Sequence, residues 1–291
     1  YISAKRAFRF LGHPFSGSIA LSSLTNNIDV TGINGNTNGF TSTSANNPSA
    51  FWYNTSNGNS SSGTDPGWTA FTNTNGIGAN AWNQFEGIRI LIRGNKNQGL
   101  DGNSYTPNTV TLDIKGALNT GTQTVTLTKG VNSNYNLISN PFASQIDLSQ
   151  TTRGSNVGNN FYVWDISQGV RGAYSSFPFS TSYVLPPFTS FFVQTNSGSS
   201  NNTIQFPESC KSITTPVNTL LSIHKYNGYH LELKLLSDNI FWDRLLFLFN
   251  DNANAKKDNI DAEKLLNPDV SIYSISEDSA FLSIDARPLI N

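Results

Sequence analysis

The sequence predicts an all-β protein built from tandem antiparallel sheets, and three observations carry this prediction. Apolar and polar residues alternate along several short stretches, which is typical of strands that bury one face and expose the other. Clusters of glycine, asparagine and serine separate these stretches, as turns between strands do. A series of motifs also occurs twice in the same order, which indicates an internal duplication.

Alternation is clearest in three segments. Residues 88–92 read IRILI, residues 110–114 read VTLDI and residues 229–235 read YHLELKL. Every second residue in each segment is apolar, so we expect three strands with one buried face. The loop 94–103 is rich in glycine and asparagine, and we expect it to join the first two of these strands as a hairpin.

The duplicated series begins with a strand and a proline corner. Residues 8–21 read FRFLGHPFSGSIAL, and residues 135–148 read YNLISNPFASQIDL. The corner residues that recur at the same spacing are Pro14, Phe15, Pro141 and Phe142. Proline fixes its own φ and pushes the preceding residue toward extended geometry. We therefore interpret both corners as structural elements that set strand register, and the alternative is a ligand-binding turn.

Three further motifs follow in the same order in both copies. The matching strings are FWYN (51–54) with YVWD (162–165), GWTAF (67–71) with GAYSSF (172–177), and RILIR (89–93) with SFFVQ (190–194). The spacing between copies shortens along the chain, as longer loops in the first copy would produce. Trp52 and Trp164 are taken to align, so we expect both rings in or near the core.

These motifs divide the chain into three expected domains. The first copy spans 1–130 and the second spans 131–214, each an immunoglobulin-like or jelly-roll β-sandwich. Pro216 marks a boundary beyond which the repeat stops. Residues 215–291 hold fuller and more charged strands, and we expect them to be the start of a further sandwich or jelly roll that is truncated.

Composition and charge exclude several classes of partner and activity. The net charge is −1 and charged residues make up 13% of the chain, so we expect no nucleic-acid partner. The sequence has no apolar run near the roughly 20 residues that a spanning helix needs, so we expect no transmembrane segment. Cys210 is the single cysteine, which rules out a disulfide within the chain. The histidines lie outside any known hydrolase motif, so we expect no enzyme.

Aromatic residues offer one candidate binding site. A flat aromatic ring stacks on the apolar face of a sugar at small entropic cost. Trp68 and Trp82 flank a polar loop that is peculiar to the first copy. Together with Tyr53 they form a candidate carbohydrate platform, and the alternative is burial in the core, where large aromatics are more often found.

Calcium is the one candidate cofactor. Calcium takes six to eight hard oxygen ligands, and the densest cluster of such residues comprises Asp251, Asn252, Asn254, Asp258 and Asp261. Two lysines interrupt this cluster, and its spacing matches no EF-hand. The alternative is a solvated loop in which Asp261 caps a short helix over 262–266.

The motifs resemble a recurrent region of large surface proteins exported by the bacterial type IX secretion system. Those proteins repeat an NL-(I/V)-x-NP-(F/Y) strand and corner, a (V/Y)-W-D strand, a Gly-Ala-Tyr element and a Pro-x-x-(S/G)-FFV strand. The matching residues here are 136–147, 163–165, 172–174 and 187–193. A later DR-x-x-x-x-F and DA-x-KL region is matched by Asp243, Arg244, Phe249, Asp261, Ala262, Lys264 and Leu265.

The resemblance implies a non-catalytic stalk or display region of a secreted cell-surface adhesin, with a role in cell adhesion or gliding motility. It implies an extracellular or cell-surface location and, during export, outer-membrane components of the type IX translocon as partners. Surface glycans and neighbouring modules are further candidate partners. Two alternatives stay open. One is a carbohydrate-binding module of a secreted enzyme, and the other is an extracellular fibre protomer joined by strand exchange.

Overall fold

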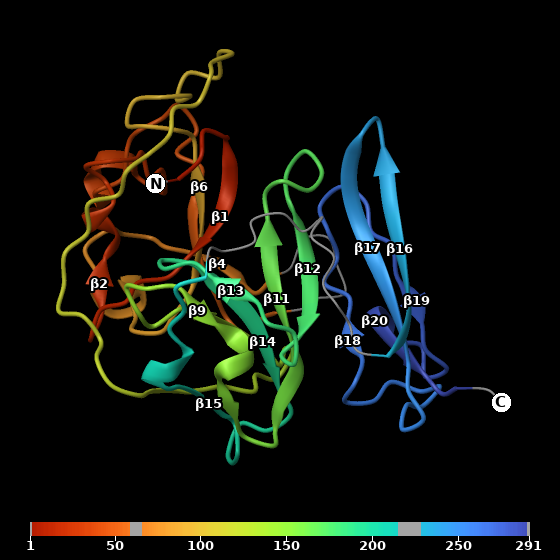
Figure 1. Ribbon diagram of the computed structural model, residues 1–291. Helices are drawn as coiled ribbons and strands as arrows, with labels where there is room; N and C mark the ends of the chain where they lie inside the picture. Colours follow the sequence, from red (N-terminus) through yellow and green to blue (C-terminus); the bar gives the residue numbers. More distant parts are fainter. Residues whose placement is uncertain (1, 59–65, 215–227, 290–291) are drawn as a thin grey trace.

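The computed structural model describes residues 2–58, 66–214 and 228–289. In these residues the chain forms short β-strands, loops and single 3-10 turns, which confirms the all-β prediction. Figure 1 shows three main sheets arranged in a row, coloured red to orange, green, and blue. We call them, with their associated segments, the first module, the second module and the third sheet. None of the helical turns in the described part of the chain is long and apolar enough to span a membrane.

The first module is built on a four-stranded antiparallel sheet with the order β1-β6-β3-β4. Its strands are β1 (Ala7–Leu11), β3 (Ala50–Tyr53), β4 (Trp68–Ala70) and β6 (Ile88–Ile92). A separate ribbon pairs β2 (Ile19–Ala20) with β5 (Ala81–Trp82). The 3-10 turns are η1 (Leu21–Ser23), η2 (Gly35–Asn38) and η3 (Gly78–Asn80). The inward isoleucines of β6 are buried in the module core, as the alternation predicts.

The second module is a sandwich of two antiparallel sheets. The larger sheet has the order β8-β14-β11-β12 and contains β8 (Tyr135–Ser139), β11 (Val157–Asp165), β12 (Ala173–Pro178) and β14 (Ser190–Thr195). The smaller has the order β10-β15-β7 and contains β7 (Gln123–Thr126), β10 (Thr152–Arg153) and β15 (Thr203–Phe206). The remaining elements are β9 (Ile146–Asp147), β13 (Val184–Leu185), η4 (Leu148–Gln150) and η5 (Glu208–Cys210). Side chains from both sheets fill one buried core between them.

Two expectations about the end of the first copy are corrected. Strand β7 pairs with β15 of the second module, so that module begins before residue 131. The hairpin expected between 88–92 and 110–114 does not form. Strand β6 already lies between β1 and β3 and therefore has no free edge for a further strand. Residues 110–114 instead run along the core without a ladder, and only Val110 makes an isolated bridge, to Ile2.

The two four-stranded sheets have the same strand order. Strands β1, β6, β3 and β4 hold the same places in the first sheet as β8, β14, β11 and β12 hold in the second. The short ribbons correspond as well, because Ile19 pairs with Trp82 and Ile146 pairs with Leu185. This correspondence is what a duplication would produce, and the duplication itself stays a prediction.

Strand pairing corrects the alignment of the last matched strings. Phe51 pairs with Arg89 in the first sheet. Its aligned counterpart, Tyr162, pairs with Phe192 in the second. Phe192, two positions after Ser190, is therefore the structural counterpart of Arg89.

The pairing also separates the two tryptophans that were taken to align. Tyr53 lies opposite Trp68 in the first sheet, and Trp164 lies opposite Tyr174 in the second. Since Tyr53 and Trp164 are both the third letter of their aligned strings, Trp164 occupies the place of Tyr53. Trp52 has no aromatic counterpart in the second module.

The third sheet has the order β16-β17-β20-β18, and β19 also pairs with β20. Its strands are β16 (Tyr229–Ser237), β17 (Ile240–Phe249), β18 (Ala262–Glu263), β19 (Ser274–Ile275) and β20 (Phe281–Arg287). Strands β17 and β20 are parallel, and the other pairs are antiparallel. The short helix expected over 262–266 does not form, because Ala262 and Glu263 pair with β20 as a strand.

Candidate functional site

The first and second modules meet where corresponding positions contact one another. Gly12 directly follows β1, and Ser139 is the last residue of β8, the strand that corresponds to β1. The Gly12 N–H donates to the carbonyl of Phe188 at 3.1 Å, and the Ser139 N–H donates to the carbonyl of Phe85 at 2.9 Å. Phe85 and Phe188 have φ values of 65° and 59°, in the left-handed region that non-glycine residues seldom adopt. The same unusual turn therefore occurs in both modules, and each turn holds the other module. We call these contacts the module junction.

Glycine allows the close approach at this junction. A Cβ added at Gly12 would lie 2.1 Å from the Cβ of Ser139 and 3.0 Å from the carbonyl oxygen of Thr189. On the neighbouring strands, a Cβ at Gly87 would lie 2.5 Å from the Cβ of Ser190. Both glycines face serines, so the two modules touch with almost no space between their backbones.

The two proline corners contain the same pair of hydrogen bonds made by different side chains. Asn140 accepts from the Phe142 N–H at 3.0 Å, and its amide nitrogen donates to nearby backbone carbonyls. His13 accepts from the Phe15 N–H at its Nδ1, at 3.3 Å, while its Nε2 donates to the carbonyl of Trp82 at 3.2 Å. Both phenylalanine rings are buried. This geometry agrees with the interpretation of the corners as structural elements, because every one of these contacts is internal.

The His13 contacts require a neutral imidazole, so we expect a pH effect on stability. Burial lowers the pKa of His13 below its ordinary value of 6.5, although hydrogen bonds to the backbone of Trp82 and Asn83 act in the opposite direction. The unfolded chain therefore binds the proton first as the pH falls. His13 therefore contributes fully to the free energy of unfolding above about pH 6.5. Its contribution decreases as the pH falls from there to the pKa of His13 in the folded chain. Chemical denaturation at pH 7.5 and pH 5 measures this loss.

The matched variant is His13→Asn, which places in the first module the residue that the second module uses. It keeps a donor and an acceptor but has no group that titrates in this range. We expect it to reduce the difference in unfolding free energy between the two pH values. Equal pH profiles for the two proteins would show that His13 does not contribute.

Two of the three residues expected to form a carbohydrate platform lie together, inside an aromatic cluster. The rings of Tyr53 and Trp68 are 5.3 Å apart, and Tyr53 also lies 4.8 Å from Phe192 of the second module. Phe10 stacks on Trp164 at 5.7 Å in the same cluster. These rings fill the space between the modules, so they do not present a flat exposed platform.

The third platform residue, Trp82, lies in a different cluster and is 0% exposed. Its indole N–H donates to the carbonyl of Glu86 at 2.9 Å. Its place in the ribbon corresponds to that of Leu185, which is also buried. Trp82 therefore packs the core of the first module, and the proposed set of Tyr53, Trp68 and Trp82 does not form one surface.

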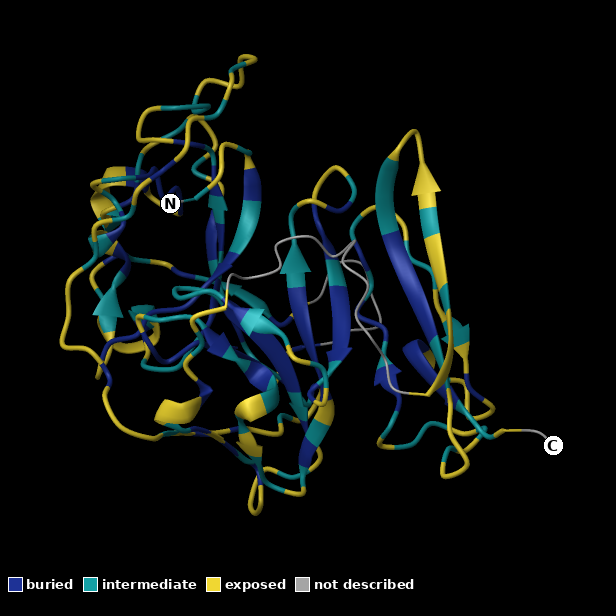
Figure 2. Ribbon diagram, viewed as in Figure 1, coloured by how far each residue is buried: buried dark blue, intermediate teal, exposed yellow. Residues whose placement is uncertain are grey.

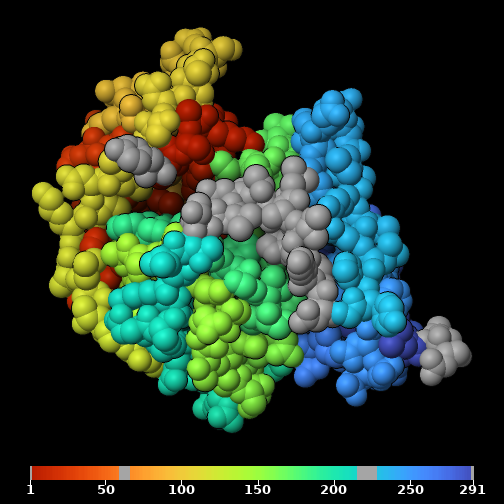
Figure 3. Space-filling model, viewed as in Figure 1, coloured from red at the N-terminus to blue at the C-terminus, as the bar shows by residue number. Residues whose placement is uncertain are grey.

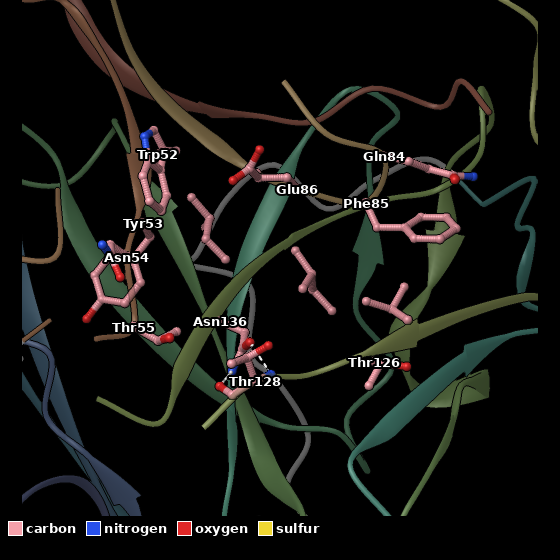
Figure 4. A pocket seen from close by; sticks show the side chains of 14 residues that line it. Trp52, Tyr53, Asn54, Thr55, Gln84, Phe85, Glu86, Thr126, Thr128 and Asn136 are labelled. Carbon is pink, nitrogen blue, oxygen red and sulfur yellow. Dashed lines mark hydrogen bonds between the residues drawn. The ribbon is translucent and has the colours of Figure 1, made fainter. Parts of the chain in front are cut away.

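A cavity of about 330 Å3 lies between the first two modules (Figure 4). It is lined from one side by the end of β3 and the segment before β6, and from the other by β7 and β8. Figure 4 shows Trp52 at one end of the cavity, Gln84 and Phe85 at the other, and Glu86 between them. The side chain of Asn136 holds one wall of the cavity in place. Its oxygen accepts from the N–H of Thr128 at 2.8 Å, and its nitrogen donates to the carbonyl of Thr128 at 2.9 Å.

Glu86 supplies the carboxyl group of this cavity. One of its oxygens accepts from the backbone and side-chain nitrogens of Asn83 at 3.0 and 3.2 Å. Burial raises the pKa of Glu86 above its ordinary value in spite of these hydrogen bonds. An aromatic ring and a carboxyl group that line the same cavity provide what a polyhydroxylated ligand requires, an apolar face and a hydrogen-bonding partner.

The loop proposed to bind calcium uses its oxygens for internal hydrogen bonds. Asp261 accepts from the N–H groups of Ala286 and Asp258 at 2.7 and 2.8 Å. Asp258 accepts from the N–H groups of Asn254 and Ile260 at 3.0 and 2.8 Å. Of the remaining candidates, Asn254 accepts from the Lys256 N–H at 3.3 Å through its side-chain oxygen, and Asp251 and Asn252 lie at an exposed turn. Across the described ranges, no three His, Cys, Asp or Glu side chains gather as a metal site would require.

Comparison of the chain with family models, with curated proteins and with solved structures gives no match. The site therefore has to be argued from its own geometry. Trp52 packs against the core of the first module, as expected of a ring in or near the core, but the sequence did not predict that it also lines the cavity. The signal that could have found it is its place in the matched strings, where Trp52 in FWYN stands against Val163 in YVWD. An aromatic residue that only one copy carries is not required by the shared fold.

Proposed function

We propose that this chain is a non-catalytic structural region of a secreted bacterial cell-surface protein, a stalk or adhesin segment that holds other parts of the protein at a fixed distance from the cell. The observation that supports this proposal best is the continuous packing of the three sheets. The space-filling view in Figure 3 shows the modules in contact in one row. A row of firmly joined sheets suits a spacer.

The second module and the third sheet are joined by a buried arginine. Arg244 lies on β17 and is 5% exposed. Its guanidinium donates to the carbonyl of Ser176 at 2.7 Å and lies 4.3 Å above the ring of Phe177. At the same interface, the Asn160 side chain donates to the carbonyl of Asp261 at 2.8 Å. These partners fix the orientation of the third sheet through directional contacts.

Contacts of the same kind join the first and second modules outside the junction. The indole N–H of Trp164 donates to the carbonyl of Phe8 at 3.0 Å. The Lys5 ammonium donates to the carbonyl of Ile166. Directional contacts of this kind, even where partly buried, restrict the relative motion that weakly joined domains show by default. The proposed spacing function depends on this restriction.

Localisation and export are tested together on intact cells of the source bacterium. We expect antibodies raised against the segment to label whole cells, and we expect the label to disappear when the type IX translocon is inactivated. Labelling only after lysis would contradict a cell-surface stalk. Surface labelling that persists without the translocon would contradict the export route alone.

A second candidate function is carbohydrate binding at the cavity, favoured by the presence of Trp52 and Glu86 among its lining residues. The ring that would stack on the sugar is then Trp52, which has no aromatic counterpart in the second module, and not Trp68 or Trp82. Loss of a stacking ring removes the apolar half of a sugar contact.

We therefore expect Trp52→Ala to weaken glycan binding about tenfold, as measured on a glycan array followed by calorimetry with the best ligand. The matched control is Tyr229→Ala, which removes an exposed aromatic ring remote from the cavity. An equal loss in both variants, or binding by neither the variants nor the original protein, would eliminate this second function.

A further inference from the structure

Strand β16 lies at one end of the third sheet, and in the described part of the chain it pairs only with β17. Leu231 is 49% exposed and Leu233 is 40% exposed. Figure 2 shows most of β16 in yellow, at the side of the molecule away from the second module. An open edge strand carries a row of backbone N–H and C=O groups that can pair with another strand.

The leucine face of β16 is opposite the face that meets the second module. Leu233 pairs with Leu245, and Lys234 pairs with Arg244. Paired residues in an antiparallel ladder share a face, and Arg244 reaches the second module. The leucines therefore lie on the opposite face, where Leu231 and Leu233 are exposed although Leu245 of β17 is buried. There the apolar stripe continues to β17, where Phe249 pairs with Tyr229 and is 36% exposed.

The charges of β16 form a self-complementary pattern. The strand has nine residues, Tyr229–Ser237, with Leu233 at its centre. If two copies pair antiparallel over all nine residues, Leu233 lies on the two-fold axis and Glu232 of each copy faces Lys234 of the other. The same register places Leu231 opposite Leu235, so the leucine stripe continues across the pair. Cross-strand pairs of opposite charge and of apolar residues both stabilise a sheet.

We propose that β16 pairs antiparallel with β16 of a second copy of this chain, joining two third sheets into one continuous sheet. The occupant is a second copy because the strand matches itself in charge and in apolar pattern. Within one chain Glu232 contacts Lys234 at 3.1 Å and Arg244 at 3.3 Å. In the dimer, Lys234 of the second copy would join these three charged side chains. Two-fold pairing is closed, so it produces dimers and does not extend into a fibre.

Sedimentation equilibrium of the whole segment over a wide concentration range tests the proposal. We expect a reversible dimer, and we expect Leu233→Lys to abolish it because two like charges would meet on the axis. The matched control is Ile275→Lys, which changes an apolar residue of 57% exposure on β19 and should leave the dimer intact. Circular dichroism verifies the fold of each variant.

A charge-exchange experiment tests the register without depending on Leu233. We expect Glu232→Lys alone and Lys234→Glu alone each to raise the dimer dissociation constant about tenfold. An equimolar mixture of the two variants should associate as the original protein does, since each lysine then faces a glutamate. Damage to the fold would not be repaired by mixing.

Three outcomes would overturn the proposal. The first is a protein that stays monomeric at every concentration. The second is a set of variants that does not follow the proposed register, whether Leu233→Lys and Ile275→Lys affect the dimer equally or the mixture of charge variants fails to associate. The third is the growth of filaments, which would indicate head-to-tail exchange of strands.

Discussion

Replacing Lys264 by alanine is expected to lower the free energy of unfolding by about 3–5 kcal/mol. The Lys264 ammonium contacts both carboxylate oxygens of Asp243 at 2.6 Å, and the two side chains are 2% and 1% exposed. Asp243 also accepts from the N–H of Ile272 at 2.8 Å. Removing the lysine leaves a buried carboxylate without its counter-charge, and the cost of that desolvated charge dominates the loss.

Urea denaturation of the whole segment measures this effect, and Lys257→Ala is the matched control. Lys257 pairs with Glu263 near the surface, where the two side chains are 32% and 28% exposed. Exposed ion pairs contribute only about 0–1 kcal/mol. If Lys264→Ala lowered the free energy of unfolding no more than Lys257→Ala does, burial of the Lys264–Asp243 ion pair would have little energetic consequence.

Replacing Gly12 by alanine is expected to cost up to about 3 kcal/mol, the upper range for overpacking a close contact. The added methyl group would lie only 2.1 Å from the Cβ of Ser139 and 3.0 Å from its Cα. Since a backbone atom lies this close, a change of rotamer cannot relieve the clash. The two modules would have to separate at the junction.

The double variant Gly12→Ala with Ser139→Gly identifies the cause, because it removes the clashing Cβ from the other side. We expect it to recover most of the lost stability in thermal unfolding. Gly158→Ala is the matched control, since a Cβ there would meet nothing closer than 3.4 Å. Failure of the double variant to recover, or an equal loss at Gly158, would place the effect of Gly12 elsewhere than in the junction.

The features that the sequence predicts well depend on local pattern. The alternation of Ile88, Ile90 and Ile92 predicts a strand with one buried face, and the three side chains are at most 1% exposed. Proline and phenylalanine at the two corners predict the same local geometry in both modules. Such features follow from the chain itself, because each depends on residues within a few positions of one another.

The features that the sequence predicts poorly depend on which partners are available in space. Residues 110–114 carry the alternation of a strand, but β6, the strand that they were expected to join, already lies between β1 and β3. The alternation in residues 110–114 therefore predicted which side chains face the core, but it did not predict whether these residues pair with another strand. In the same way, Ala262 and Glu263 join β20 because an edge is present there, whereas capping preferences alone favoured a helix.

The candidate site was predicted only in part for the same reason. Aromatic content indicated that rings matter, yet Tyr53 and Trp68 pack between the modules and Trp82 packs in a core. Trp52 lines a cavity whose other wall comes from β7 and β8, which are distant from it in the sequence. Lys264 and Asp243 are likewise far apart in the sequence, so local sequence patterns do not predict their ion pair.

Differential scanning calorimetry of the whole segment tests most directly whether the three sheets form one body, as the proposed spacer requires. We expect one transition whose calorimetric and van't Hoff enthalpies agree, and we expect both Gly12→Ala and Lys264→Ala to move all of it to lower temperature. Separate transitions, with one variant shifting only the first module and the other only the third sheet, would contradict a single rigid body.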